Sequence, residues 1–490
     1  MNPLSNLRSL LWKLKKDEVK TLLLFLDFQI PAANRPSKSA QLTSILLDEN
    51  TYSTNDIQKT IYGKPNPTAF YKLVSRLKEK VYEVLLLDQH INEVSYTLRN
   101  KVIFGLKKRL LISELLFNRG ATEELENRLK EIVRDAKDYE IYDVLSQALN
   151  VLRRLYIVRK RKKLVDETST EIAFYKKAEF LVDNANSEFS RMMNRINFSF
   201  DTREYYSDLL ILVSKLNEWY KETKSASIGY SYYLLSVEQF QTQGDYKNSD
   251  RCLVELGKML EEKPVFSTKN RLGTWRLNYA SNLLHLKLYN EAYLNSQMAY
   301  NLFQGVALNE ILSLEVMFYS RYYNDEFAES EKVLLKAMSK LKGVDAIVNE
   351  RFKFYSAVLL FVNGDYKQAE AELNALHDLK KDKEGWNVMR KIYLLLCKIE
   401  LGEYDYVDLQ TQSLHKYIKR INSLKFINPR YIIILRILSK LANLGFDYNF
   451  TYKSRKKYFD LLDGEDSQLA WKVKSPELIN FTDWFKKKLK

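Results

Sequence analysis

The chain has 490 residues, of which 46% are hydrophobic, with 77 lysines and arginines against 62 acidic residues. This hydrophobic content excludes wholesale disorder, and 14 glycines and 8 prolines are too few for the many turns of an all-β protein of this length. A single core rarely grows this large, so several domains or a repeat array are expected. The formal charge of +15 favours anionic partners such as acidic proteins, phosphate backbones or anionic lipid, without deciding among them.

The first 90 residues predict a small helical module, with helices over residues 4–15, 17–28, 37–47, 56–62 and 68–87. Pro31 and Pro36 separate the second helix from the third, because proline removes a donor and restricts the preceding residue. Ser53 or Thr54 is expected to cap the fourth helix, which ends at Gly63.

The fourth helix, the turn after it and the longer fifth helix together resemble a helix-turn-helix or winged-helix element. Such an element would present donors near the start of its reading helix to the edges of bases. Glu79 and Glu83 on the polar face would meet phosphate, which favours the alternative that the helix only caps the fold. The candidates for nucleic-acid contact in this module are Asn66, Thr68, Tyr71, Lys72 and Arg76.

Residues 91–227 predict long amphipathic helices that form degenerate hairpins, with a looser junction near 187–204. Their main feature is a basic segment at 153–163, interpreted as helical, whose five consecutive cations would occupy all sides of the helix. It is either a phosphate-binding patch or a solvated helix end, where cations favourably meet the C-terminal dipole. Its candidate nucleic-acid contacts are Arg153, Arg154, Arg159, Lys160, Arg161, Lys162 and Lys163.

A turn motif recurs in the second half of the chain, best seen at Gly364-Asp365-Tyr366. An aromatic residue follows each turn, and a small residue or valine stands three positions later, where paired helices must approach closely. The spacings of 43, 38, 39 and 38 residues are typical of helical solenoids. The equivalent aromatic residues are Tyr246, Tyr289, Phe327, Tyr366 and Tyr404.

These turns and second helices resemble the tetratricopeptide repeat (TPR) family over about residues 228–425. The period exceeds the family's roughly 34 residues, so the copies are divergent. The resemblance implies an all-α fold, a right-handed α-solenoid of TPR-like hairpins preceded by the small N-terminal module. Residues 426–490 would add a further hairpin, with helices over 429–444 and 451–462, and a capping segment over 476–490.

In TPR proteins the first helix of each hairpin lines a concave groove, which here implies helices near 271–287, 307–323, 346–362 and 386–401. A positive bias on this face would suit an acidic segment of a protein partner. Alternatively, these side chains only keep a helix face solvated. The candidate groove residues are Arg276, Asn278, Arg321, Arg351, Lys353, Arg390 and Lys391.

Motifs that carry catalysis are missing, since the sequence has no phosphate-binding G-x-x-x-x-G-K-[ST], no G-x-G-x-x-G and no G-x-S-x-G. The histidines His90, His285, His377 and His415 are scattered, with no partner at metal-ligand spacing. We therefore expect no catalytic residue, cofactor or metal. Cys252 and Cys397 are read as buried free thiols, which favours a reducing, cytoplasmic location, and the apolar run at 21–30 is too short to span a bilayer.

Two functions remain. The first is a non-enzymatic cytoplasmic adaptor or scaffold that binds a segment of a partner protein in the solenoid groove. The alternative is a regulator associated with DNA or RNA, which would use the N-terminal module and the basic segment at 153–163. The sequence indicates neither the partner's identity nor the oligomeric state.

Overall fold

The computed structural model describes residues 3–27, 36–48, 50, 52–86, 98–198, 204–263, 266–379, 382, 385–422, 428–464 and 469–489. About 80% of the chain is helical, and the described residues contain no strand, so the predicted all-α class is confirmed. Packing divides the chain into two units, residues 1–108 and 109–490, and helix α6 (Leu98–Asn118) crosses this division. No helix within the described ranges is long and apolar enough to cross a membrane.

Unit 1 contains the five predicted helices, each within a few residues of its expected bounds. Ser53 caps the fourth helix by accepting from the backbone of Asp56, and Gly63 ends that helix with a φ of 78°. The predicted break between Pro31 and Pro36 lies, up to residue 35, outside the described residues. The helices are α1 (Pro3–Leu11), α2 (Lys16–Asp27), α3 (Lys38–Leu47), α4 (Thr54–Tyr62) and α5 (Pro67–Leu86).

The core of unit 1 is organised around α5, whose apolar stripe packs against α1, α2 and α3. Phe70, Leu77 and Val81 on this stripe are fully buried, as the helical spacing predicts. Val84 near the end of the helix is also buried, whereas Leu85 beside it is exposed. The opposite side of α5 faces solvent.

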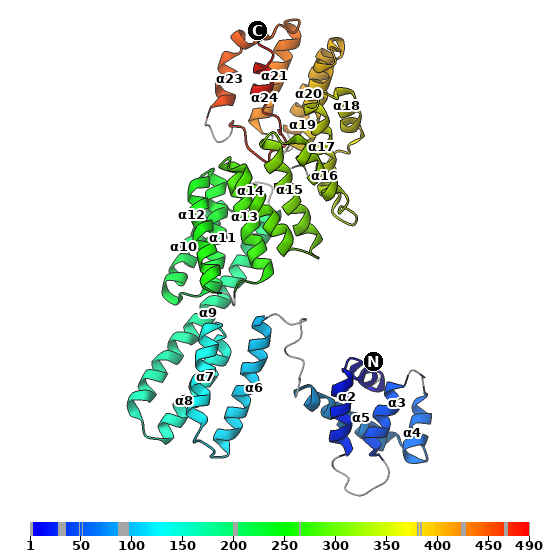
Figure 1. Ribbon diagram of the computed structural model, residues 1–490, viewed down its shortest axis with the longest axis vertical. Coiled ribbons are helices and arrows are strands. Elements are labelled where there is room, and N and C mark those ends of the chain that lie inside the picture. The colour runs from blue at the N-terminus through cyan, green and yellow to red at the C-terminus, as the bar shows by residue number, and fades with distance from the viewer. Residues whose placement is uncertain are drawn as a thin grey trace. The chain divides into compact units, whose positions relative to one another are not determined.

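Unit 2 is a succession of helices that pack on their neighbours in chain order (Figure 1). After α6 they are α7 (Leu125–Asp138), α8 (Tyr142–Val158), α9 (Lys162–Phe198), α10 (Tyr206–Thr223), α11 (Ala226–Gln243), α12 (Tyr246–Glu262), α13 (Lys269–His285), α14 (Tyr289–Leu302), α15 (Ala307–Tyr323), α16 (Phe327–Met338), α17 (Ala346–Val362), α18 (Tyr366–Ala375), α19 (Trp386–Glu400), α20 (Tyr404–Asn422), α21 (Pro429–Asn443), α22 (Tyr448–Ser454), α23 (Lys456–Asp463) and α24 (Phe481–Lys486).

The recurring turn motif marks the hairpins of this array. Each of its five aromatic residues is the first residue of a second helix, namely α12, α14, α16, α18 and α20. Consecutive helices pack pairwise, as in a helical repeat array. The residues three positions later allow this close approach, and all are fully buried: Ser249, Ala292, Ser330, Ala369 and Val407.

Among these aromatic residues, Tyr246 and Tyr289 also join one hairpin to the next. Tyr246 at the start of α12 stacks on His285 at the end of α13, with ring centroids 4.1 Å apart. The ring of Tyr289 of α14 contacts that of Tyr323 at the end of α15 in a tilted arrangement, with ring centroids 5.9 Å apart. First helices also touch each other, as in α13 with α15 and α19 with α21. No hairpin buries its apolar face alone, and stacking supplies a continuous core from α13 to α24, with separate clusters under α9–α11 and α11–α13.

Three sequence expectations are corrected in unit 2. The basic segment is not one helix, because α8 ends at Val158 and α9 begins at Lys162, with a turn between them where Lys160 has a φ of 53°. Helix α9 continues through residues 187–198, where a looser junction was expected, and residues 199–203 lie outside the description. The helix predicted over 451–462 is interrupted at Arg455, between α22 and α23.

Candidate functional site

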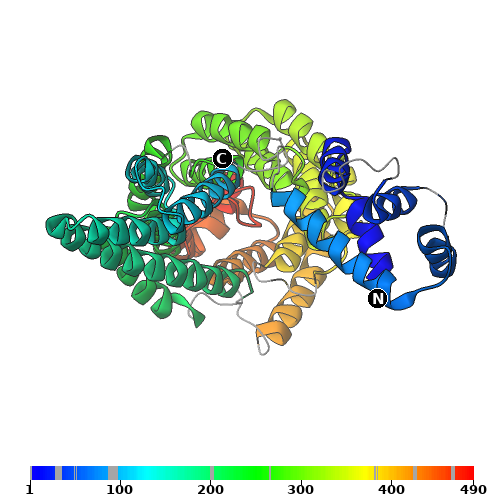
Figure 2. The same ribbon diagram turned by 90° about the horizontal axis from the view of Figure 1, so that it is seen from below.

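A non-helical segment near the end of the chain crosses the first helices of several hairpins. This C-terminal strap comprises residues 469–480. Its Lys474 ammonium donates to Ser281 of α13 at 3.1 Å, and its Ile479 backbone N–H donates to the Tyr393 hydroxyl of α19 at 2.9 Å. Figure 2 shows the C-terminal end enclosed by the curve of the array. We call the surface of α13, α15, α17, α19 and α21 on this side the inner face.

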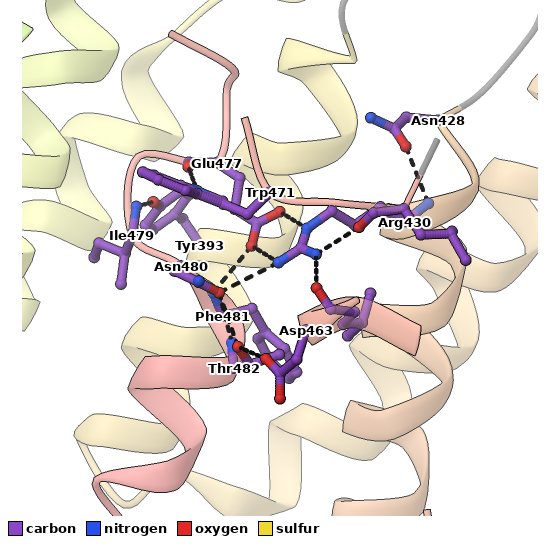
Figure 3. A network of polar contacts seen from close by, with 12 residues as sticks. Tyr393, Asn428, Arg430, Asp463, Trp471, Glu477, Ile479, Asn480, Phe481 and Thr482 are labelled. Carbon is purple, nitrogen blue, oxygen red and sulfur yellow. Dashed lines mark hydrogen bonds and ion pairs between the residues drawn. The ribbon is translucent and has the colours of Figure 1, made fainter. Parts of the chain in front are cut away.

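The strap is anchored on α21 by one arginine (Figure 3). Arg430 donates through Nε and Nη2 to the two carboxylate oxygens of Glu477, at 2.6 and 2.8 Å. Its Nη1 donates to the carbonyls of Leu462 and Leu469, at 2.8 and 2.7 Å. Both charged side chains are only 2% exposed. A charge pair can be buried in this way only when further hydrogen bonds satisfy the guanidinium, as they do here.

Further hydrogen bonds close the strap on itself and onto α19. The indole of Trp471 donates to the carbonyl of Glu477 at 2.7 Å, which folds the first half of the strap back on the second. Glu477 also accepts from the backbone N–H of Phe481 at the start of α24. Beyond the strap, the indole of Trp484 donates to Glu400 of α19 at 2.7 Å. The end of the chain is thus part of the folded core.

Next to the strap, the inner face contains a buried polar network between α15 and α17. The hydroxyl of Tyr319 donates to that of Tyr355 at 2.8 Å, and Tyr355 donates to the carboxylate of Glu315 at 2.6 Å. Arg351 forms an ion pair with the same carboxylate. Burial alone would raise the pKa of Glu315, but the charges of Arg351 and Lys474 and the tyrosine hydrogen bond hold it below its usual value. Glu315 is therefore a buried anion facing the strap.

On α13 the inner face carries a neutral histidine. Burial, and then the charges of Lys474 and Lys472, lower the pKa of His285 to about 3. His285 has no partner at metal-ligand spacing in the sequence, and in the structure its ring stacks on that of Tyr246. Asn278, Ser281 and His285 follow helical spacing, so they lie along one side of α13.

One groove candidate, Arg351, belongs to this network, and another, Asn278, lies one helical turn from a residue that the strap contacts. Asn278 is one helical turn from Ser281, the residue that Lys474 contacts, and its amide donates to the carbonyl of Thr274. Arg351 belongs to the network through Glu315. Partner contact by either residue remains a prediction.

The remaining groove candidates make contacts within their own hairpin or with the preceding one. Arg276 donates to Asn295 of α14 at 2.7 Å, and the guanidinium of Arg321 covers the ring of Tyr293 of α14 at 3.8 Å. These contacts direct both arginines toward a second helix rather than along the inner face. The other contacts are those of Lys353 with Glu350, Arg390 with Leu376 and Asp378, and Lys391 with the ring of Tyr417.

In unit 1, one nucleic-acid candidate has a structural role. The side chain of Asn66 accepts from the backbone of Ala69 at 3.1 Å, and its own backbone N–H donates to Gln58 of α4 at 2.8 Å. Asn66 therefore caps α5 and fixes the turn after α4. The other candidates follow helical spacing on α5 and are exposed: Thr68, Tyr71, Lys72 and Arg76.

The basic segment of unit 2 divides into structural and exposed cations. Arg159 and Arg161 both pair with Glu126 of α7, at 2.7 and 2.9 Å, and Arg159 also donates to the Thr122 carbonyl. Arg153 donates to Asn150, and the guanidinium of Arg154 lies over the ring of Phe117. The two arginines on Glu126 thus close the turn between α8 and α9. The exposed lysines are Lys160, Lys162 and Lys163.

The strap and its partners were missed by sequence reasoning. Glu315 is a lone acid inside the apolar run of α15, and Arg430 precedes an apolar run in α21. A charge inside such a run must be paired if it is buried. That rule could have selected both residues, but it could not have named Glu477 as the partner of Arg430.

The described residues offer little reactive chemistry. Within them, no group of three histidine, cysteine or acidic side chains could hold a metal ion, and His90 lies outside them. Burial raises the pKa of the Cys397 thiol to about 12 and that of Cys252 to about 11, so neither is an activated nucleophile. No protein-family model matches this sequence, and no curated protein matches it.

Proposed function

We propose that this protein is a non-enzymatic adaptor whose array is a right-handed TPR-like solenoid that binds a segment of a partner protein on its inner face. One observation carries the proposal. A non-helical polypeptide segment, the strap, already lies against the inner face and contacts α13, α15, α19 and α21. A surface that holds one such segment has the groups needed to hold another.

The groups that hold the strap contact its backbone as well as its side chains. The Tyr393 hydroxyl accepts from the backbone N–H of Ile479, and Arg430 donates to the carbonyl of Leu469. Backbone contacts of this kind give affinity for an irregular segment, and pockets for individual side chains give selectivity. Since several candidate arginines are already paired within the chain, an acidic partner would find fewer available cations than the charge of +15 suggests.

The test is site-specific photo-cross-linking in the full-length chain. A photoreactive residue replaces Asn278 on the inner face or, as the matched control, Lys332, which is 70% exposed on the second helix α16. The proposal expects one partner protein to be cross-linked from position 278 and not from position 332. Partner cross-links from position 332 alone, or none from position 278, would contradict it.

The second candidate function is a regulator that binds DNA or RNA. It is favoured by the exposed stripe of α5, where Lys72 and Arg76 lie one turn apart beside Tyr71. Each lysine or arginine that contacts a phosphate contributes about one unit to the slope of log affinity against log salt. The double variant Lys72→Ala/Arg76→Ala should therefore lower the slope by about two units for duplex DNA or RNA. A slope equal to that of a Lys332→Ala control would exclude α5 from binding.

A further inference from the structure

The strap consists of two parts that differ in burial. From Pro476 onward it is core, since Glu477 and Leu478 are each 2% exposed and Arg430 binds Glu477. In the preceding tip, residues 471–475, only Val473 is buried, and Lys472 is exposed. Segments with few buried contacts open at much lower free energy than the core does. The tip, which is also held by the bond from the Trp471 indole to the Glu477 carbonyl, is therefore the part of the strap expected to open at the lowest free energy.

The tip contacts two neighbouring first helices. The ring of Trp471 lies edge-on to Tyr323 of α15, with centroids 5.4 Å apart, and Lys474 donates to Ser281 of α13. Three residues of chain span at most about 10 Å, close to the 8–10 Å between packed helices. A segment whose aromatic residue contacts α15 can therefore place a lysine three positions later against α13, the neighbouring first helix.

Charge favours a cation at the position of Lys474. The carboxylate of Glu315 is buried, and the positive charge of Lys474 is one of the causes that hold its pKa below the usual value. Tyr323 and the neutral ring of His285 supply an aromatic, uncharged surface beside it. The inner face at α13 and α15 is thus built for one aromatic and one basic side chain.

We propose that the tip of the strap is a built-in occupant of the partner site, and that the partner segment it stands in for carries an aromatic residue followed three positions later by lysine or arginine. This inference rests on the proposed adaptor function. It specifies the kind of segment that binds and how binding is regulated. In the full-length chain the tip competes with the partner, so binding requires the tip to leave α13 and α15. The partner segment then takes the places of Trp471 and Lys474.

The experiment uses the full-length chain and a fluorescent peptide with the sequence of residues 469–476. The chain is tested as wild type, as the double variant Trp471→Ala/Lys474→Ala, and as the control Lys472→Ala, whose changed residue is exposed. We expect the double variant to bind the peptide at least tenfold more tightly than either of the other two chains. A peptide in which the tryptophan and the second lysine are alanine should bind no chain.

The rate of hydrogen exchange of residues 469–480 is measured in the same chains, to show whether the tip has left the inner face. Faster exchange in the double variant without peptide binding would overturn the proposal, because an open site would then lack affinity for its occupant. Unchanged exchange without binding would overturn it as well, since the tip would be a fixed part of the core. If cross-linking from position 278 identifies a partner but the peptide does not bind, the proposal that the tip occupies the partner site is rejected and the adaptor function is retained. If the peptide binds and no partner is cross-linked there, the adaptor proposal fails instead.

Discussion

The guanidinium of Arg430 and the carboxylate of Glu477 form a doubly hydrogen-bonded ion pair between residues 47 positions apart. Units of a helical repeat array normally contact only their neighbours, and stability adds up from one unit to the next. This pair holds a strap that also reaches Ser281, 193 positions from Lys474. Hairpins that are distant in the chain are thereby linked, and we expect the region from α13 to α24 to unfold as one cooperative body.

Replacing Glu477 with glutamine should destabilise unit 2 by about 3–5 kcal/mol, because removal of one partner leaves a buried charge uncompensated. The measurement is urea unfolding of the full-length chain, followed by circular dichroism. Asp460→Asn is the matched control, since it breaks the exposed pair between Lys456 and Asp460 and should leave the midpoint unchanged. Equal midpoints for the Glu477 and Asp460 variants would show that the buried pair does not anchor the strap.

His285 should make unit 2 less stable in mild acid. Its pKa is lowered to about 3 in the folded chain, whereas the unfolded chain takes up the proton near pH 6.5. Stability is therefore complete above about pH 6.5 and is lost as the pH falls from there toward 3. Between pH 7 and pH 5 the loss due to this residue is about 1–2 kcal/mol.

The variant His285→Phe keeps a ring against Tyr246 and should remove this part of the pH dependence. The free energy of unfolding is measured at pH 7 and pH 5 for the variant, the wild type and His377→Gln, whose parent side chain is 86% exposed. The His377 control should retain the wild-type difference. A His285→Phe chain that does so too would refute the lowered pKa of the partly buried His285.

The basic segment should separate by function when single residues are changed. Arg159→Ala removes the ion pair to Glu126 and the hydrogen bond to the Thr122 carbonyl, and should cost about 1–3 kcal/mol of stability. Lys163→Ala should have no measurable effect on stability, because this side chain is 90% exposed. Thermal unfolding distinguishes the two variants. Equal melting temperatures would mean that the turn between α8 and α9 is held by other contacts.

Two glycines should respond to alanine in opposite directions. A Cβ at Gly257 of α12 would overlap the ring of Trp275 on α13, so Gly257→Ala should cost about 1–3 kcal/mol through overpacking. A Cβ at Gly105 of α6 meets no atom within 4 Å, so Gly105→Ala should stabilise its helix by about 0.5–1 kcal/mol. Chemical denaturation of both variants checks the signs. A neutral Gly257→Ala would indicate a looser contact between α12 and α13.

The parts of the fold that were predictable are those with local causes. The aromatic residue at each turn and the small residue three positions later determine where a second helix starts and how closely it packs, and both follow from residue type and spacing. The strap could not be predicted in this way, because Trp471 and Glu477 are placed by contacts with helices far away in the sequence. The turn at Lys160 was missed because its cause, Glu126 on α7, is also distant.

The same distinction applies to the site. Charge and spacing selected Arg276 and Arg321 as groove residues, but their contacts to α14 depend on side chains of the neighbouring helix. Spacing alone cannot tell which side of a first helix lies on the inner face and which side contacts a neighbouring second helix. Asn278 and Arg351 were selected by the same reasoning; Asn278 is one turn from Ser281, which the strap contacts, and Arg351 pairs with Glu315.

The inner face as a protein-binding surface is tested most directly by hydrogen exchange of the full-length chain with and without the segment captured from position 278. We expect slower exchange in α13 and α15 on binding, faster exchange in residues 471–475 as the tip leaves, and no change in α5 or α16. Protection confined to α5, or to the second helices α14 and α16, would contradict it.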